Sequence, residues 1–355
     1  MKRAKRLATW LLVLVIAMSL LSGCGSKQSK PEEPSDKASS GEQADKEGQV
    51  SEKAASKLRV AVVFPGSIKD MGWNQSGYEA LMEAKDRFGV EVSYQESVGK
   101  AEVKDVLRNY AADGYDLVIG HDLYFTDPVL EVAQEFPDVM FGISGGTKGA
   151  DNVVSMTATN WENTYLAGTL AGLMTKSNTI GILTATDSPI ALRMVQGFKN
   201  GASAQNPNVK IIHAYVGSWD DVVKGKELVR SMVQQGADII YTQAGQVNVG
   251  AIEACKEAGV YAIGAIRDMW DVAPDTVISS AMSPPGALIT NMIKQLTEGT
   301  LKGGTYVLGV KDGAEDLAPY HNFEDKIPEE VKKKVAEVRQ ALIDGKIEPP
   351  KLENK

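Results

Sequence analysis

The chain has 355 residues, of which 43% are hydrophobic and 24% charged, and 46 acidic residues against 38 basic ones give a net charge of −8. At roughly 150 residues per domain this length predicts about two folded domains, and the composition is typical of a globular protein rather than a disordered or collagen-like chain. The acidic balance argues against a nucleic-acid partner.

The first 23 residues have the pattern of a lipoprotein signal peptide. The basic start, 1–6, precedes an apolar stretch, 7–21, that is too short to span a bilayer comfortably. The stretch leads into Leu21-Ser22-Gly23-Cys24, which resembles the lipobox of bacterial lipoproteins, where the signal is removed and the new terminal cysteine is lipidated. We therefore expect an acyl-bearing Cys24, palmitate included, on the extracytoplasmic face of the cell membrane. An anchor helix with an incidental cysteine is the alternative.

Residues 24–57 are predicted to form a disordered tether that begins at the lipidated Cys24. Beyond that cysteine the segment consists mostly of Ser, Lys, Glu, Gly and Pro, with almost no large apolar side chain. Such a composition cannot bury enough surface to offset the entropy lost on ordering. The tether would hold a folded body above the membrane while allowing it to reorient.

From Leu58 onward, β-rich apolar runs alternate with helical patterns. Expected strands are 58–64, 90–94, 116–120 and 139–144, and then 179–183, 210–215, 238–242 and 260–265. Helical patterns separate them, which predicts parallel sheets joined by right-handed crossovers. The segment 160–176 is predicted to be a buried core helix. We thus expect an α/β protein of two doubly wound lobes.

The last third of the chain suggests that neither lobe is continuous in sequence. A helix is expected over 284–299 and a strand over 305–311, so the chain crosses back after the second run. We assign 58–160 plus about 283–304 to the N-terminal lobe and 161–282 plus about 305–350 to the C-terminal lobe. Open α/β sheets bind ligands at the carboxyl ends of their strands, and two facing lobes create a cleft.

Signals for catalysis and metal binding are weak. Gly142-Ile143-Ser144-Gly145-Gly146 fits the pattern of a nucleophile elbow, but the residues after Ser144 predict a turn and a strand rather than a helix. An esterase using Ser144 is therefore a remote alternative. Phosphate-binding glycine fingerprints are absent, and His121, His213 and His321 lack the spacing of a zinc site. We interpret these histidines as surface or loop residues and Cys255 as a small buried side chain, and we expect no cofactor, metal or enzymatic activity.

Two predicted loops of the first lobe carry residues suited to a flat polar ring. Asp70, Trp73 and Asn74 lie between the first strand and the first helix, where they supply an acceptor, a stacking surface and an amide. The alternative is that Asp70 caps the helix while Trp73 packs on the lobe. Tyr124 comes after the third strand and contributes an aromatic to the same rim, and Ser144 ends the fourth strand.

The second lobe offers a matching set at its own strand ends. Trp219, Gln243, Asp268 and Trp270 all lie in predicted loops after strands. Trp219 and Trp270 could close over a bound ring, because aromatic pairs contribute roughly 0.5–1.5 kcal/mol beyond burial. Packing between the lobes is the equally open alternative for either tryptophan alone.

At these residues the chain resembles the basic membrane protein (BMP) family of ABC-transporter substrate-binding lipoproteins, whose PnrA-like members bind purine nucleosides. The resemblance extends from Leu58 to about Gly345. It rests on several stretches: Asp70 to Ser76, Phe136 to Phe141, Tyr165 to Gly168, Gln196 to Ala202, Gln235 to Asp238 and Gly259 to Gly264.

The resemblance implies a type I periplasmic-binding-protein fold with hinged lobes, and delivery of a captured ligand to a permease and an ATPase. By position, the aromatic and amide of the family's first loop fall on Trp73 and Asn74. The chain differs from the nucleoside binders at Ser144 and near Ser283. Where the nucleoside binders have a loop with a pair of Asp residues, this chain keeps only Asp268. The expected ligand therefore includes free bases and other ring compounds as well as nucleosides.

Taken together, the sequence predicts a membrane-anchored, monomeric substrate-binding component of an ABC importer that captures a purine nucleoside, purine base or similar flat ring solute by lobe closure. The alternative from a different class is a lipoprotein sensor that presents a sugar or signalling molecule to a membrane receptor.

Overall fold

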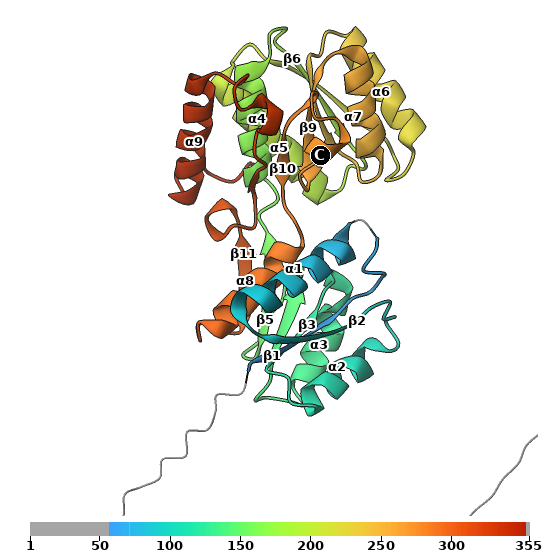
Figure 1. The fold of residues 1–355 in the computed structure, drawn as a ribbon, viewed down its shortest axis with the longest axis vertical. Coiled ribbons are helices and arrows are strands. Elements are labelled where there is room, and N and C mark those ends of the chain that lie inside the picture. Colours follow the sequence, from blue (N-terminus) through green and yellow to red (C-terminus); the bar gives the residue numbers. More distant parts are fainter. Residues whose placement is uncertain (1–56, 71, 353–355) are drawn as a thin grey trace, which may run out of the picture. The chain divides into compact units, whose positions relative to one another are not determined.

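The computed structural model describes residues 57–70 and 72–352, which belong to a single compact unit spanning 54–355. The predicted signal peptide, the predicted lipidation site Cys24 and nearly all of the predicted tether lie outside the described residues. Two six-stranded sheets form the body, one in each lobe, and Figure 1 shows them with helices on both faces.

The first sheet is wholly parallel, with the order β11-β5-β4-β3-β1-β2. Helices α1 and α8 cover one face through an apolar cluster that includes Leu81 and Ile289, whereas α2 and α3 cover the other through Leu107 and Val129. The elements of this lobe are β1 Arg59–Val63, α1 Trp73–Phe88, β2 Glu91–Gln95, α2 Val103–Ala112, β3 Leu117–Gly120, the 3-10 helix η1 Leu123–Phe125, α3 Thr126–Ala133, β4 Met140–Ser144, β5 Val153–Ala158, α8 Gly286–Thr297 and β11 Gly304–Leu308.

The second sheet has the order β12-β10-β9-β8-β6-β7, and only β12 runs antiparallel, against β10. Its elements are α4 Glu162–Met174, β6 Thr179–Thr184, α5 Pro189–Gln205, β7 Lys210–Tyr215, α6 Val222–Gln234, β8 Ile239–Gln243, α7 Val247–Ala258, β9 Tyr261–Ile266, η2 Trp270–Val272, β10 Val277–Met282, η3 Val310–Asp312, β12 Asp316–Leu317, η4 His321–Phe323 and α9 Glu329–Ile343. Helices α6 and α7 pack on one face, and α4, α5 and α9 lie on the other.

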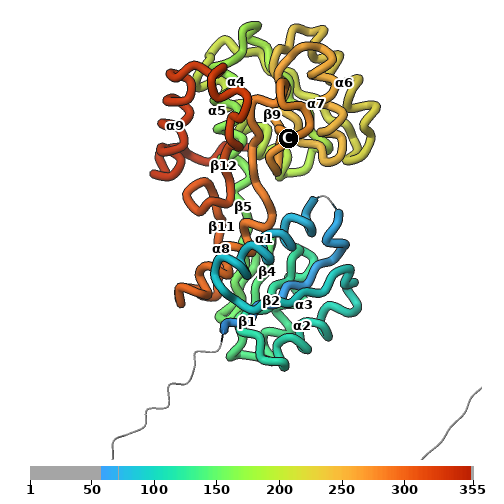
Figure 2. The backbone as a smooth tube through the Cα atoms, viewed as in Figure 1, coloured from blue at the N-terminus to red at the C-terminus, as the bar shows by residue number. Residues whose placement is uncertain are grey.

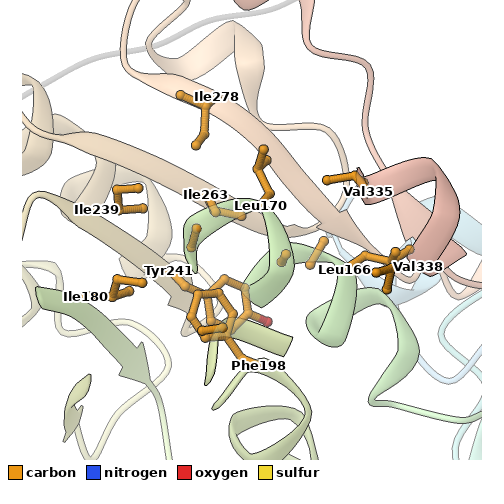
Figure 3. Packing of buried hydrophobic residues seen from close by; sticks show 14 of the residues in the cluster. Leu166, Leu170, Ile180, Phe198, Ile239, Tyr241, Ile263, Ile278, Val335 and Val338 are labelled. Carbon is orange, nitrogen blue, oxygen red and sulfur yellow. The ribbon is translucent and has the colours of Figure 1, made fainter. Parts of the chain in front are cut away.

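The core of the second lobe is built around α4. Leu166 and Leu170 of this helix belong to one apolar cluster with Phe198 and Tyr241 (Figure 3), and the rings of Phe198 and Tyr241 stack with centroids 5.0 Å apart. A Cβ on Gly168 would lie 2.0 Å from the backbone oxygen of Phe198, so only glycine allows α4 and α5 to approach this closely. The prediction of a buried core helix in this segment is confirmed.

The chain passes between the sheets three times: from β5 to α4, from β10 to α8, and from β11 to η3 (Figure 2). Strand β11 pairs in parallel with β5 along its whole length, so the first sheet continues to Leu308. The lobe boundary predicted near residue 304 lies at the start of β11, so it would assign this strand to the second lobe instead. Strand β11 joins the first sheet because β5 would otherwise be an unpaired edge strand, which a parallel strand can complete.

Two carboxylates, one buried and one partly buried, connect the first and third of these passages. Glu315, 1% exposed, accepts hydrogen bonds from the Thr159 hydroxyl and from the backbone amides that open α4. In return, Glu162 at the start of α4 accepts a 2.7 Å bond from the Val310 amide. Burial raises the pKa of both carboxyl groups. The two connecting segments are thus held to each other where the chain passes between the sheets.

Candidate functional site

The predicted binding residues of the first lobe lie beyond the carboxyl ends of β1, β3 and β4. Because these strands are parallel neighbours, their carboxyl ends meet at one edge of the sheet. Trp73 and Asn74 open α1, Tyr124 lies in η1, and Ser144 is the last residue of β4. The fold therefore brings these four residues to the same edge.

Asp70 caps helix α1. Its Oδ1 accepts bonds from the amides of Gly72 and Gln75, and its Oδ2 accepts bonds from the amide and the side-chain Nδ2 of Asn74, at 2.8–3.0 Å. Partial burial raises its pKa, but these hydrogen bonds outweigh burial and hold the pKa of Asp70 below its usual value. All four acceptor positions of the carboxylate are used. Asp70 therefore acts as a helix cap, as the alternative interpretation of the sequence proposed. Its carboxylate oxygens have no free position for a ligand.

Trp73 lies against His121. The two rings stack with centroids 4.9 Å apart and planes 24° apart. The indole Nε1 donates a 2.8 Å bond to the backbone oxygen of His121, and the imidazole Nε2 lies 2.9 Å from the backbone oxygen of Trp73. The His121 side chain is completely buried. His121 lies in the loop after β3, which agrees with the interpretation as a loop residue, but it is not a surface residue, because its contacts with Trp73 enclose it.

Two of the predicted binding residues at this edge have a buried polar atom without a hydrogen-bond partner. Asn74 uses its Nδ2 on Asp70, but its Oδ1 has none, and neither has the hydroxyl of Ser144. Buried polar atoms are nearly always paired in folded proteins. These two atoms are therefore candidates to bind a ligand. Tyr124 differs from them, since it is 68% exposed and lies under the Lys100 ammonium.

Ser144 does not have the surroundings of a nucleophile. After β4 the chain turns and enters β5, whereas a nucleophile elbow requires a helix directly after the serine. No histidine or carboxylate hydrogen-bonds its hydroxyl among the described residues. Its place at the carboxyl end of a central strand fits contact with a bound molecule instead.

In the second lobe, the loop after β9 presents Asp268 and Trp270. The Trp270 ring stacks on the ring of His321, with centroids 4.7 Å apart. The Nε2 of His321 lies 2.6 Å from Oδ2 of Asp268, while Oδ1 of Asp268 accepts a bond from the Trp270 amide. The indole Nε1 of Trp270 is buried without a partner. Asp268 thus positions the loop, and Trp270 retains a free donor.

Strained backbone marks the start of this loop. Ile266, the last residue of β9, has a φ of 71°, which is rare for a β-branched residue. The Arg267 amide donates to the Ala265 oxygen at 2.9 Å, so Ile266 is the centre of a γ-turn of the strained, positive-φ kind. Strain of this kind costs about 1–3 kcal/mol and clusters at ligand-binding sites.

Gln243 and Trp219 lie at the ends of the neighbouring strands. Gln243 ends β8, is 7% exposed, and its Oε1 is buried without a partner. Trp219 is half exposed and lies on Gly245, where a Cβ would be 3.1 Å from the indole Cε3. Gly245 has a φ of 62°, so glycine is favoured there on conformational grounds as well. Gln243 therefore resembles Asn74 in the first lobe, whereas Trp219 lies at the outer rim.

The remaining histidines and Cys255 serve the fold. His213 lies within β7 and its Nε2 is 2.9 Å from the Thr184 hydroxyl. His321 begins η4. Burial raises the pKa of the Cys255 thiol to about 12, in agreement with the interpretation as a small buried side chain. Among the described residues no group of three or more His, Cys, Asp or Glu is placed to hold a metal ion.

Sequence reasoning missed His121 and His321 as partners of the two tryptophans. A signal existed for His121, because it comes directly after the buried strand β3, at the edge where ligands bind. His321 offered no such signal, since it meets Asp268 across 53 residues. Within 57–70 and 72–352, no helix has the length and apolar character needed to cross a membrane.

Comparison with known proteins agrees with this architecture. Residues 57–353 match the family model Bmp, described as "ABC transporter substrate-binding protein PnrA-like". A purine-binding protein of Brucella abortus is 29% identical over 83% of this chain and 84% of its own length. The transcriptional activator protein Med of Bacillus subtilis is 28% identical over 76% of this chain and 84% of its own length.

Among solved structures, an ABC transporter solute-binding protein from Conexibacter woesei superimposes with a TM-score of 0.71 at 25% identity, covering 84% of this chain and all of the other. The expected type I periplasmic-binding-protein fold is confirmed. Because the family model covers nearly the whole described body, the chain belongs to the Bmp family of PnrA-like ABC transporter substrate-binding proteins.

Proposed function

We propose that this protein captures a flat, polar ring compound, a purine nucleoside or free base, and delivers it unchanged to an ABC permease and ATPase. The observation that carries the proposal is the set of buried polar atoms without partners at the strand ends of both lobes. Four of these atoms belong to residues singled out from sequence as ligand-binding: Asn74, Ser144, Gln243 and Trp270.

The chemistry of these four atoms matches a neutral heterocycle. Asn74 and Gln243 offer amide oxygens that accept hydrogen bonds, Trp270 offers a donor, and Ser144 offers both. The two carboxylates nearby are engaged within the protein, Asp70 as a helix cap and Asp268 with His321. A ring that carries both N–H groups and ring nitrogens would satisfy this combination, with indole surface for stacking.

The positions of these atoms support binding by lobe closure. Asn74 and Ser144 belong to the first lobe, whereas Gln243 and Trp270 belong to the second, and the three connecting segments join the lobes. A ligand that contacts both lobes stabilises the closed arrangement by its differential affinity. We propose capture without chemistry, since Ser144 has no base on its hydroxyl among the described residues.

Calorimetry on residues 54–355 tests the ligand class. Adenosine, guanosine, adenine, hypoxanthine and riboflavin are titrated in turn, and we expect saturable one-to-one binding of at least one. Trp73→Ala should weaken that binding by about 1–3 kcal/mol, the range for base–aromatic stacking. Tyr306→Ala, an aromatic truncation on the edge strand β11, is the matched control and should bind normally. Absence of heat with all five compounds would reject the purine-type ligand.

We also propose that Cys24 carries a lipid that anchors the protein to the extracytoplasmic face of the membrane. The sequence supports this through the lipobox-like Leu21 to Cys24. In cells fed a radioactive or alkyne-tagged palmitate, the full-length chain should be labelled and sediment with membranes. Cys24→Ala should lose both properties, whereas Cys255→Ala, the only other cysteine in the chain, should keep both. Labelling that survives Cys24→Ala would contradict the anchor.

A ligand sensor is the second candidate, favoured by the similarity to the transcriptional activator of Bacillus subtilis. The two functions differ in the event that binding triggers, which is transport in an importer and a transcriptional response in a sensor. In an importer, deleting the gene should reduce uptake of the radiolabelled ligand while transcription responds only secondarily. Unchanged uptake with a lost transcriptional response would favour the sensor.

A further inference from the structure

His121 and Trp73 are joined by three contacts. The indole Nε1–H donates to the His121 backbone oxygen at 2.8 Å, and the imidazole Nε2 is 2.9 Å from the Trp73 backbone oxygen. The rings also stack at a centroid distance of 4.9 Å. These contacts act on both the backbone and the side chain of Trp73. They leave the indole few alternative rotamers.

The same contacts define the protonation state of His121. A backbone oxygen only accepts hydrogen bonds, so the Nε2 of His121 must carry the proton that it donates to Trp73. The other nitrogen, Nδ1, is buried without a partner. Burial lowers the pKa of His121 to about 4, although the Trp73 carbonyl and the Asp70 carboxylate raise it in part. At neutral pH the ring is therefore an uncharged imidazole.

The imidazole of the pair is tightly enclosed. A Cβ on Gly77 would lie 2.5 Å from Nε2 of His121, so α1 passes close to the imidazole. The Phe64 ring meets the imidazole edge to face, with centroids 5.3 Å apart. Near the indole, a Cβ on Gly145 would lie 3.2 Å from Cη2 of Trp73. Asp70 is the charged group that acts on the pKa of His121, whereas Phe64, Trp73 and Gly77 are uncharged.

We propose that His121 is a positioning residue for ligand binding, which orients the Trp73 indole toward the ligand. This inference rests on the proposed function, in which Trp73 stacks on the bound ring. His121 itself need not contact the ligand. Any effect of His121 on ligand affinity should then depend entirely on Trp73.

A double-mutant cycle tests this route. With adenosine as the probe and residues 54–355 as the protein, His121→Phe keeps an aromatic ring but removes the Nε2 donor. It should weaken binding about 3- to 10-fold in the wild-type background, the range expected for the loss of about one hydrogen bond. In the Trp73→Ala background the same substitution should have no further effect. His213→Phe, the same change on β7 of the other lobe, is the matched control.

The outcomes separate the two proposals. If Trp73→Ala leaves adenosine binding unchanged, the proposed stacking fails and the positioning role of His121 fails with it, whereas the proposed ligand class stands. If Trp73→Ala weakens binding but His121→Phe weakens it equally in both backgrounds, only the positioning role is overturned. If adenosine does not bind, the proposed function fails on that probe, and fluorine NMR of Trp73 still decides how His121 acts on the indole.

Fluorine NMR of protein labelled with 5-fluorotryptophan reports on the indole directly. The Trp73 resonance, identified by its loss in Trp73→Phe, should be a single sharp line whose position is constant from about pH 7.5 to about pH 5.5, well above the pKa of His121. In His121→Phe the line should shift and broaden, while His213→Phe leaves it unchanged. A titration of the wild-type line with a midpoint near the ordinary histidine pKa of about 6.5 would contradict the neutral, locked imidazole, and so would an unaltered line in His121→Phe.

Discussion

Each lobe holds a tryptophan stacked on a histidine, yet the two pairs are built differently. In the first lobe the His121 ring is fully buried, bonded to backbone, and the Trp73 Nε1 is satisfied. In the second lobe His321 is about 30% exposed and bonded to Asp268, and the Trp270 Nε1 is buried without a partner. The first pair is a closed unit, and the second retains a free donor.

The two tryptophans can therefore serve a ligand in different ways. An indole whose donor is satisfied and whose ring is fixed offers mainly its face, which suits stacking. An indole with an unpaired N–H offers a directional hydrogen bond, which suits recognition of a ring nitrogen or carbonyl. We infer that the first lobe supplies a preformed stacking surface and the second supplies specificity.

Acidification should distinguish the closed pair from the open one most strongly. The pKa of His121 is about 4 in the folded state against about 6.5 when unfolded, so only the unfolded chain takes up this proton between those values. His121 therefore costs no stability above about pH 6.5, and the free energy of unfolding should fall by about 3 kcal/mol as pH drops to about 4. Urea unfolding at several pH values measures this fall in the free energy of unfolding. In His121→Phe the free energy of unfolding should depend less on pH, and an unchanged pH dependence in that variant would refute the low pKa of His121.

A Gly→Ala substitution near each tryptophan–histidine pair tests how tightly the surroundings of that pair are packed. Gly77→Ala places a Cβ 2.5 Å from the His121 ring and should cost about 1–3 kcal/mol of stability. Gly264→Ala meets the Met269 side chain and the Ser280 hydroxyl at 2.7–2.8 Å, under the loop that holds Trp270. Thermal unfolding measures both. Only Gly77→Ala should shift the fluorine resonance of Trp73, and a shift caused by Gly264→Ala would show that the two pairs are not independent.

Replacing each tryptophan by phenylalanine should give opposite signatures. Trp73→Phe breaks the bond to the His121 oxygen, so we expect about 1 kcal/mol lower stability. Trp270→Phe removes a donor that has no protein partner, so stability should hold while ligand binding weakens about 3- to 10-fold. Denaturant unfolding and calorimetry on both variants give the comparison. Equal losses in both properties would show that the two tryptophans have the same role.

A weaker effect still is expected at the exposed carboxylate of the second lobe. Asp268 and His321 are each about a third exposed, and solvent-exposed polar pairs of this kind contribute roughly 0–1 kcal/mol. Asp268→Asn should therefore lower stability by less than about 1 kcal/mol, and any charge contribution to the difference should shrink in high salt. Unfolding at two ionic strengths checks this. A large loss that salt does not change would mean that Asp268 acts as a buried structural group.

Sequence patterns predicted the parts of this protein that depend on local periodicity. Apolar runs such as Val60 to Phe64 mark buried parallel strands wherever they occur, so both sheets and their helices were accessible. The importance of the loops at the carboxyl ends could be inferred from the same topology. Trp73, Asn74 and Gln243 could be selected because residue type and strand-end position together restrict the candidates.

The features that sequence could not predict depend on contacts between distant residues. The partner of Trp73 is 48 residues away and that of Asp268 is 53 residues away, and no local pattern encodes either pairing. Asp70 illustrates the same limit, because a carboxylate before a helix suits a cap and a ligand contact equally until its donors are seen. Strand β11 pairs in parallel with β5, which is otherwise an edge strand. Which strand lies at the edge is a property of the folded sheet and not of the local sequence.

Native mass spectrometry of the intact protein, purified from its own cells without added ligand, would show whether it holds a ring compound and releases it unchanged. We expect one small aromatic heterocycle bound one-to-one, released at its unaltered mass, and absent from Trp73→Ala purified in parallel. A bound molecule with no ring system, or one converted into another compound during incubation with the protein, would contradict ring capture without chemistry.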